Sequence, residues 1–196
     1  MKKATRLFLC LGLAVIAPVI AQAGDVYLIN SARSTVSFGV HHFIGTTKGK
    51  FTRCTGKIEI DRAHPAGSSV SAQIEVRSID TGIRKRDDHL CSAEFFDAAQ
   101  YAQITFQSRS VKQTGLQAGD IEGDLTMHGV TRPIVLHVKL LNSLGNDEPT
   151  ARSRWAVTTD PLKRRDFNLM FSKSAETLSG IGQDVTIALE IEATKG

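Results

Sequence analysis

The sequence is poor in cysteine and aromatic residues, and it lacks the short motifs that mark many enzyme classes. Only 3 cysteines, 1 tryptophan and 2 tyrosines occur among its 196 residues. It contains no C-x-x-C pair, no G-x-S-x-G elbow, no phosphate-binding loop and no H-E-x-x-H sequence. These absences exclude zinc ribbons, thioredoxin-like sites, P-loop enzymes and the commonest hydrolases. We therefore expect a protein that is not an enzyme and has no catalytic residues.

Long hydrophobic runs are absent except at the N-terminus. There, three basic residues precede an apolar run over residues 7–21, which ends in the small-residue pattern Ala21-Gln22-Ala23. This order is typical of a cleavable secretory signal. An uncleaved membrane anchor is the alternative, but the run is shorter than the roughly 20 apolar residues of a span and contains Pro18. We expect residues 1–23 to be removed and residues 24–196 to form a single secreted domain.

The excess of basic residues is confined to that first segment. The whole chain has 24 basic and 20 acidic residues and a net charge of +4. Residues 1–23 hold three of the basic residues and none of the acidic ones, so the remainder has a net charge of +1. The phenylalanines fall mostly in apolar positions rather than among basic residues. Both observations argue against a nucleic-acid-binding surface, and no nucleic-acid partner is expected.

Two cysteines, Cys54 and Cys91, remain after the signal, because Cys10 lies inside it. A secreted protein meets conditions that permit disulfides. A bridge between the pair would close a loop of about 37 residues and stabilise the fold by roughly 4 kcal/mol. Two separate buried thiols are the alternative, and the sequence leaves both open.

Apolar and polar residues alternate along most of the chain after Gly24, in stretches bounded by Gly, Asn, Asp and Pro. This pattern predicts antiparallel strands with one apolar and one solvated face. Residues 83–96 lack alternation, so we expect a short helix or two turns there. About eight strands are expected, near residues 35–40, 57–61, 70–77, 104–106, 121–127, 134–140, 155–157 and 185–192.

Strands with one apolar face must stack as two sheets or close on themselves. We predict closure into an all-β, antiparallel, eight-stranded barrel with one short helix. Such a barrel is just wide enough inside for its own side chains or for one slender ligand. A slip of one residue would exchange the two faces of any strand. The residues expected to line the lumen are Phe38, Val40, Ile58, Ile74, Phe106, Leu125, Ile134, Leu136, Trp155 and Ile187.

Polar groups near the lumen are few. His42 is in phase with the apolar residues before it. One interpretation is an ordinary histidine in the core or at the rim. The other is that His42 and Arg86 contact the head group of a ligand. His41 and His42 point to opposite faces of a strand, so we expect no metal site. The basic runs 84–86 and 163–165 are either solvated or attract an anionic head group or a membrane surface.

One stretch resembles a known family. Residues 123–134, GDLTMHGVTRPI, are similar to the signature G-D-L-T-h-H-G-V-T-x-P-h of the YceI-like family of bacterial periplasmic polyisoprenoid-binding proteins. The chain departs from the pattern of this family at Ala102, where the family commonly has a proline, and at Asn168, where it commonly has a glycine. Cysteines at positions 54 and 91 are also unusual for the family. Over residues 27–194, further matches follow in the family's order at Ser37-Phe38 with His42, 49–51, 86–90 with 95–97, 104–108, 165–167 and 181–185.

The resemblance implies a lipocalin-like barrel in the periplasm, whose apolar lumen holds an isoprenoid tail such as that of a quinone or a polyprenyl lipid. The ligand would be bound non-covalently, and no covalent cofactor is implied. A secreted lipid-acting hydrolase and a stress-related partner protein with a filled core are the alternatives. The sequence leaves a transient membrane contact and a homodimer open.

Overall fold

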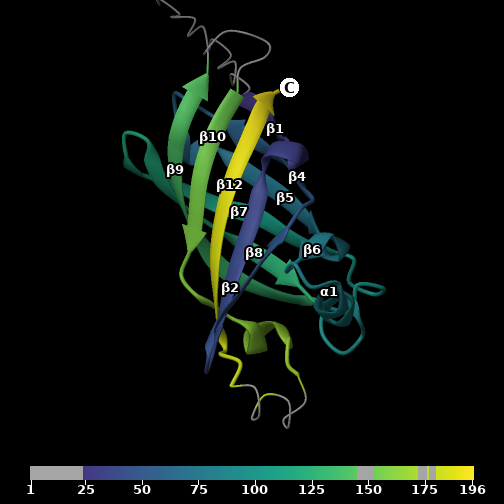
Figure 1. Cartoon of the computed structure of the whole chain (residues 1–196). Coiled ribbons are helices and arrows are strands. Elements are labelled where there is room, and N and C mark those ends of the chain that lie inside the picture. The colour runs from purple at the N-terminus through teal and green to yellow at the C-terminus, as the bar shows by residue number, and fades with distance from the viewer. Residues whose placement is uncertain (1–23, 145–151, 172–175, 177–179) are drawn as a thin grey trace, which may run out of the picture.

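The computed structural model describes residues 24–144, 152–171, 176 and 180–196. The expected signal segment, residues 1–23, lies outside the described residues. The described chain is mostly β-structure (Figure 1). Its strands are β1 (Asp25–Ile29), β2 (Thr35–His42), β3 (Gly45–Phe51), β4 (Cys54–Ile60), β5 (Ser69–Glu75), β6 (Ile79–Asp80), β7 (Gln103–Gly115), β8 (Ala118–Met127), β9 (Val130–Leu144), β10 (Arg152–Thr159), β11 (Leu162–Lys163) and β12 (Asp184–Lys195).

Eight of these strands close into a barrel, which confirms the predicted fold class. The ring follows the order β1-β4-β5-β7-β8-β9-β10-β12. It returns to β1 because residues 27–29 pair with residues 193–195 of β12. All of these pairings are antiparallel. Closure pairs the backbone groups that an open sheet would leave exposed at its two edges.

Three of the long barrel strands are interrupted. β1 continues into β2 after the 3-10 turn η1 (Ser31–Arg33), and both pair with β12. In the same way β3 leads into β4, and β5 leads into β6 through η3 (Val76–Ser78). The β2–β3 hairpin therefore extends the wall beyond the closed ring, and the end of β3 pairs with β6.

The alternation did not predict β1 or β3. The sequence of β3, GTTKGKF, has a single apolar residue, so it shows no period of two. β3 forms because the neighbouring β2 offers backbone partners along its whole length, from Val36 opposite Phe51 to His42 opposite Gly45. Tertiary pairing overrides local preference here.

The segment expected to be helical contains α1 (Arg84–Cys91). Its first turn is anchored by Asp87, whose carboxylate accepts hydrogen bonds from the backbone N–H and the hydroxyl of Thr81. Among the described residues, no helix is both long enough and apolar enough to span a membrane. The described chain also contains short 3-10 turns, η2 (Pro65–Gly67) and η4 (Arg164–Phe167) among them.

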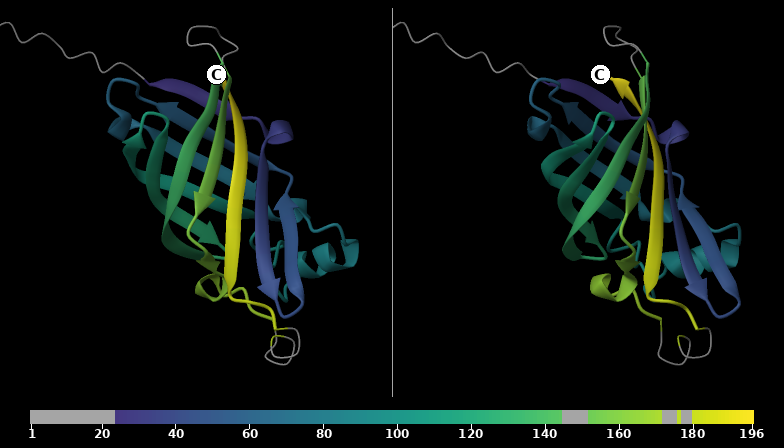
Figure 2. Two further views of the ribbon diagram at one scale, coloured as in Figure 1. Left: turned by 60° about the vertical axis from the view of Figure 1, so that its left-hand side comes forward. Right: turned by 90° about the vertical axis from the view of Figure 1, so that its left-hand side faces the viewer.

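The two ends of the barrel differ, as the views in Figure 2 show. The mouth end carries the β4–β5 connection with η2, the β7–β8 turn and the C-terminal residue Gly196. The capped end carries α1, the β8–β9 turn, η4 and the β2–β3 hairpin.

Aromatic side chains fill the capped end. Phe95 stacks on Phe171 with ring centroids 4.5 Å apart and meets Phe96 edge to face at 5.1 Å. Phe167 and Leu169, at the end of η4, are buried. These rings come from the α1 region and from the η4 region, which are far apart in sequence. Their packing closes this end of the barrel.

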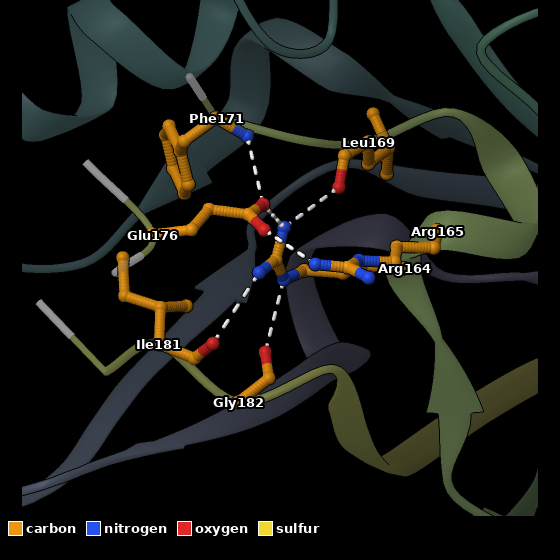
Figure 3. Close-up of polar contacts among 7 residues, drawn as sticks. All are labelled: Arg164, Arg165, Leu169, Phe171, Glu176, Ile181 and Gly182. Carbon is orange, nitrogen blue, oxygen red and sulfur yellow. Dashed lines mark hydrogen bonds and ion pairs between the residues drawn. The ribbon is translucent and has the colours of Figure 1, made fainter. Parts of the chain in front are cut away.

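A buried arginine secures the η4 region (Figure 3). The side chain of Arg164 is 3% exposed and forms an ion pair of 2.6 Å with Glu176. The other oxygen of Glu176 accepts from Arg165, and its first oxygen also accepts from the backbone N–H of Phe171. The basic run 163–165 is therefore partly structural. The remaining N–H groups of the Arg164 guanidinium donate to the backbone carbonyls of Leu169, Ile181 and Gly182.

Candidate ligand-binding cavity

An apolar cavity of about 380 Å³ runs along the inside of the barrel. Its volume falls within the range of roughly 300–1,000 Å³ that is usual for small-molecule sites. Eight of the ten apolar residues expected in the lumen line it. These are Ile58, Ile74, Phe106, Leu125, Ile134, Leu136, Trp155 and Ile187. That they contact a ligand remains a prediction.

The other residues predicted to bind ligand lie outside the cavity lining, and this corrects the predicted lumen. Phe38, Val40 and His42 belong to β2, which pairs with β3 beyond the closed ring. The ring of Phe38 packs against Phe51 at 5.6 Å and covers Gly49, where a Cβ would lie 2.4 Å from the ring. The strand keeps its phase, but the space that it faces is already filled with protein side chains.

The two predicted head-group contacts lie at the capped end. His42 ends β2 at the tip of the β2–β3 hairpin, away from the mouth. Arg86 donates from Nε to the hydroxyl of Thr81 at 2.8 Å and from Nη2 to the carbonyl of the same residue at 2.9 Å. Arg86 thus secures the start of α1. Neither residue lines the cavity.

Other apolar residues, which were not among those expected in the lumen, also line the cavity. Val36 and Leu189 have the expected phase, and Val111 follows a register shift in β7 between Ser108 and Ser110 that sequence cannot reveal. This second set includes Ile29, Val36, Phe51, Cys54, Val70, Ile104, Val111, Ile121, Val138, Leu140, Val157, Leu189 and Ile191. The phase of an alternating stretch could have predicted the inward position only for the residues that belong to such a stretch.

The indole of Trp155 shows how a polar group is accommodated in this apolar wall. Its Nε1–H donates to the hydroxyl of Ser153 at 2.9 Å. Ser153 is two residues away on β10 and therefore on the same face of the strand. The ring can line the cavity because its one hydrogen-bond donor is already satisfied.

The charged residues of the lining, Glu59, Asp61 and Arg62, lie at the mouth end. Arg62, just after β4, donates from Nε to Asp25 at 2.8 Å and from Nη2 to the hydroxyl of Tyr27 at 3.0 Å. The ammonium of Lys195 pairs with the other oxygen of Asp25 at 2.8 Å. Hydrogen bonds from Lys195 and then Arg62 lower the pKa of Asp25. The Arg62 side chain is thus held at the rim of the cavity.

Acidic groups at the mouth are also paired. Asp61 accepts from the backbone N–H groups of Ala63 and His64 at 3.0 and 2.8 Å, which shapes the turn before η2. Glu59 accepts hydrogen bonds from Lys57 and Ser69, and both lower its pKa. Charges are therefore balanced among the groups that line the mouth and their ion-pair partners. The basic ones are Lys57, Arg62 and Lys195, and the acidic ones are Asp25, Glu59 and Asp61.

The two cysteines are separate thiols. Cys54 is buried and lines the cavity, and burial raises its pKa to about 11. Cys91, at the end of α1, is half-buried and also has a raised pKa, chiefly because of burial. Of the two alternatives that the sequence left open, the structure has the unbridged one. A thiol with a raised pKa is a poor nucleophile at neutral pH.

The described residues offer no cluster of three or more His, Cys, Asp or Glu side chains that could hold a metal ion. The two adjacent histidines behave as expected for strand neighbours. His41 is exposed and its Nδ1 lies 2.8 Å from the hydroxyl of Thr46, while His42 is half-buried.

Comparison with known proteins places the chain in a family. The model of the YceI-like domain matches residues 27–193. The chain belongs to the YceI-like family. A UPF0312 protein of Vibrio cholerae is 35% identical over 166 residues, which cover 82% of this chain and 87% of that relative.

Solved structures show the same YceI-like fold. The crystal structure of BcnA from Burkholderia cenocepacia matches with a TM-score of 0.72 and 26% identity, over 85% of this chain and 99% of that one. A polyisoprenoid-binding domain from Saccharophagus degradans has a TM-score of 0.62 over 87% of this chain and 98% of that domain. At 19% identity, the second match shows the fold alone.

The YceI-like signature at residues 123–134 builds both the cavity and its cap. Leu125 and Ile134 line the cavity. Gly123 lies under the ring of Phe106, where a Cβ would come within 2.4 Å of it. Between the two strands, the ring of His128 meets Tyr101 at 4.8 Å, and its Nδ1 lies 3.3 Å from the carbonyl of Phe167. The signature is therefore a structural element of this barrel.

Proposed function

We propose that this YceI-like protein is a binding and carrier protein for a long-chain isoprenoid amphiphile in the periplasm. The observation that carries the proposal is the apolar cavity of about 380 Å³ with a polar mouth. A slender apolar tail gains roughly 25 cal/mol for each Å² removed from water, so several hundred Å² supply on the order of 10 kcal/mol before ordering costs. The polyisoprenoid-binding domain from Saccharophagus degradans, which has this fold, supports the same ligand class.

The mouth favours an uncharged head group. A phosphate carries one or more negative charges and is bound best by an excess of arginine or lysine. Here Arg62 is already paired with Asp25, and Glu59 and Asp61 are close by. Neutral carbonyl or hydroxyl groups can accept or donate hydrogen bonds at such a rim without unbalancing it. Among isoprenoid lipids, a quinone meets this requirement better than a polyprenyl phosphate.

The two alternative functions have less support. A filled-core protein would leave no continuous cavity. A hydrolase needs a nucleophile beside a general base. Among the described residues that line the cavity there is no histidine, and the thiol of Cys54 has its pKa raised rather than lowered. The lining therefore supports binding rather than catalysis.

Mass spectrometry of the purified protein tests the proposal. We expect lipid extracted from the denatured protein to contain a long-chain prenyl quinone, and the emptied protein to take the same quinone up again. Recovery of polyprenyl phosphates alone would contradict the head-group assignment. A protein that neither contains nor takes up any prenyl lipid would contradict the carrier function.

A further inference from the structure

One leucine at the mouth end is both fully exposed and part of the cavity lining. Leu116, in the β7–β8 turn, is 99% exposed and lines the cavity. Residues 113–118, QTGLQA, carry no charged side chain. Together with the turn residues Gln113 and Gln117, which also line the cavity, Leu116 extends the apolar surface of the cavity outward to the surface of the protein.

Two further leucines are about half-exposed on the strands of the barrel. Leu141 is 47% exposed on β9, next to Leu140, whose backbone N–H donates to the carbonyl of Gln117 in the turn. Leu140 lines the cavity, and Leu141 is the extra residue of a bulge in β9, between Leu140 and Asn142, which pair with Trp155 and Arg154 of β10. Leu28 is also about half-exposed, on β1, and lies against the C-terminal Gly196. Isolated exposed leucines are ordinary on proteins, but the position of Leu116 on the rim of an apolar cavity is not.

A second apolar tip at the opposite end provides a contrast. Phe43 and Ile44, in the β2–β3 turn, are 81% and 95% exposed. The ring of Phe43 packs against Gly180, so part of it has an intramolecular partner. Neither residue lines the cavity, which is closed off at that end by the aromatic cap. Of these two exposed tips, the one with Leu116 is continuous with the apolar lining of the cavity, and the one with Phe43 and Ile44 is not.

We propose that the β7–β8 tip inserts Leu116 into the surface of a lipid bilayer and so places the mouth of the cavity against the membrane. This inference rests on the proposed carrier function, because a lipid that leaves the bilayer through this mouth avoids exposing its tail to water. The charges around the mouth are balanced, so the contact is apolar and does not depend on anionic lipids. The occupant of this surface is thus a bilayer of neutral or zwitterionic lipids.

Co-sedimentation with phosphatidylcholine vesicles tests the docking step, using the full secreted domain. We expect Leu116→Ser to weaken vesicle association about tenfold, the order expected from losing one buried leucine side chain. Ile44→Ser is the matched control, since it removes a side chain of equal exposure at the capped end, and should leave association unchanged. Association should also persist at high salt. Equal losses in both variants, or loss of wild-type association at high salt, would overturn the proposal.

A second measurement separates this inference from the carrier function. The protein is offered a long-chain prenyl benzoquinone either dispersed in detergent or incorporated in phosphatidylcholine vesicles. Relative to its own binding of the dispersed quinone, Leu116→Ser should take the quinone from vesicles about tenfold more slowly than wild type does. If wild type binds no quinone in either form, the carrier function fails, while co-sedimentation still decides the docking. Unchanged uptake from vesicles by Leu116→Ser would refute the docking itself.

Discussion

The ion pair between Arg164 and Glu176 is the most deeply buried charge interaction in the described part of the chain. The two side chains are 3% and 11% exposed. Arg164 is enclosed by backbone carbonyls that cannot neutralise its charge, so Glu176 supplies the only negative charge among its hydrogen-bond partners in the described residues. Buried pairs are costly to form but even more costly to break.

Replacement of Glu176 by glutamine should therefore destabilise the protein by about 3 kcal/mol, because a buried guanidinium loses its counter-charge. Urea unfolding followed by circular dichroism measures the change. Glu190→Gln is the matched control, since Glu190 is 72% exposed and lies 3.7 Å from Arg154, and should cost less than about 1 kcal/mol. Similar losses in the two variants would show that the buried pair has no special role.

The same pair predicts how stability depends on pH. Hydrogen bonds from Arg164 and then Arg165 lower the pKa of Glu176 to about 2, from an ordinary value of 4.5. The unfolded chain therefore takes up the proton first as pH falls. The stabilisation is complete above about pH 4.5 and is lost progressively between about pH 4.5 and 2.

Unfolding free energies measured at several values across this range check the sign. We expect wild type to lose stability more steeply than Glu176→Gln on acidification below pH 4.5. Asp25 and Glu59, whose pKa values are also lowered, contribute equally to both proteins and cancel in the comparison. Parallel curves would contradict the assignment.

Among the structural elements, the β8–β9 turn explains why the family signature at residues 123–134 contains His128 and Gly129. His128 and Gly129 have φ of 50° and 73°, as the two central residues of a tight hairpin turn with positive φ at both positions require. A Cβ at Gly129 would lie 2.8 Å from the ring of Tyr101. The turn thus holds Tyr101 and η4 together at the capped end.

Gly129→Ala should lower stability by about 1–3 kcal/mol, because it combines left-handed backbone strain with a contact against Tyr101. Thermal unfolding measures this loss. Gly115→Ala, in the β7–β8 turn, is the control: its Cβ would lie an unstrained 3.6 Å from Ala118. Quinone binding by folded Gly129→Ala should remain near wild type, since the turn does not line the cavity; a selective loss of binding would indicate a ligand contact there.

Asn168 stands directly after η4, where the YceI-like family commonly has a glycine, and η4 still ends in the same way. Asn168 follows η4 with φ of 57°, and its backbone N–H donates to the carbonyl of Arg165. Asparagine tolerates this left-handed conformation better than most residues that have a side chain. The element therefore keeps its shape although the common glycine is absent.

For the molecule as a whole, the volume of the cavity determines how much ligand can be held. Ala72 on β5 lines the cavity, whereas its neighbour Ser71 is exposed on the outer face. Ala72→Phe should fill part of the cavity and lower the amount of bound prenyl quinone several-fold, with little effect on folding because empty space is available. Native mass spectrometry measures the bound fraction.

Ser71→Phe serves as the control for that variant, because it adds the same ring to the same strand but on the solvent side. It should retain wild-type binding. Should Ala72→Phe bind as much quinone as wild type, the ligand must lie elsewhere, and the cavity would no longer support the carrier function.

The alternating pattern could predict the barrel because side chains on a strand change face at every residue, so a local pattern reports which face is buried. It placed eight lining residues, from Ile58 to Ile187, on the inner face. It could not separate Phe38 from them, because Phe38 is also buried and in phase, but against Gly49 and Phe51. Burial has the same sequence signature whether the neighbour is protein or a ligand.

The sequence by itself determined the fold class, the family and the face that each recognised strand presents to the interior, because these depend on local periodicity and on motifs. Tertiary structure alone decided where the ring closes, which end is capped and which is open, and that Arg62 rather than His42 or Arg86 lies at the mouth. Those features depend on register and on contacts between segments far apart in the chain, such as Arg62 with Asp25 and Arg164 with Glu176. No local pattern records such contacts, because either partner alone resembles an ordinary surface charge.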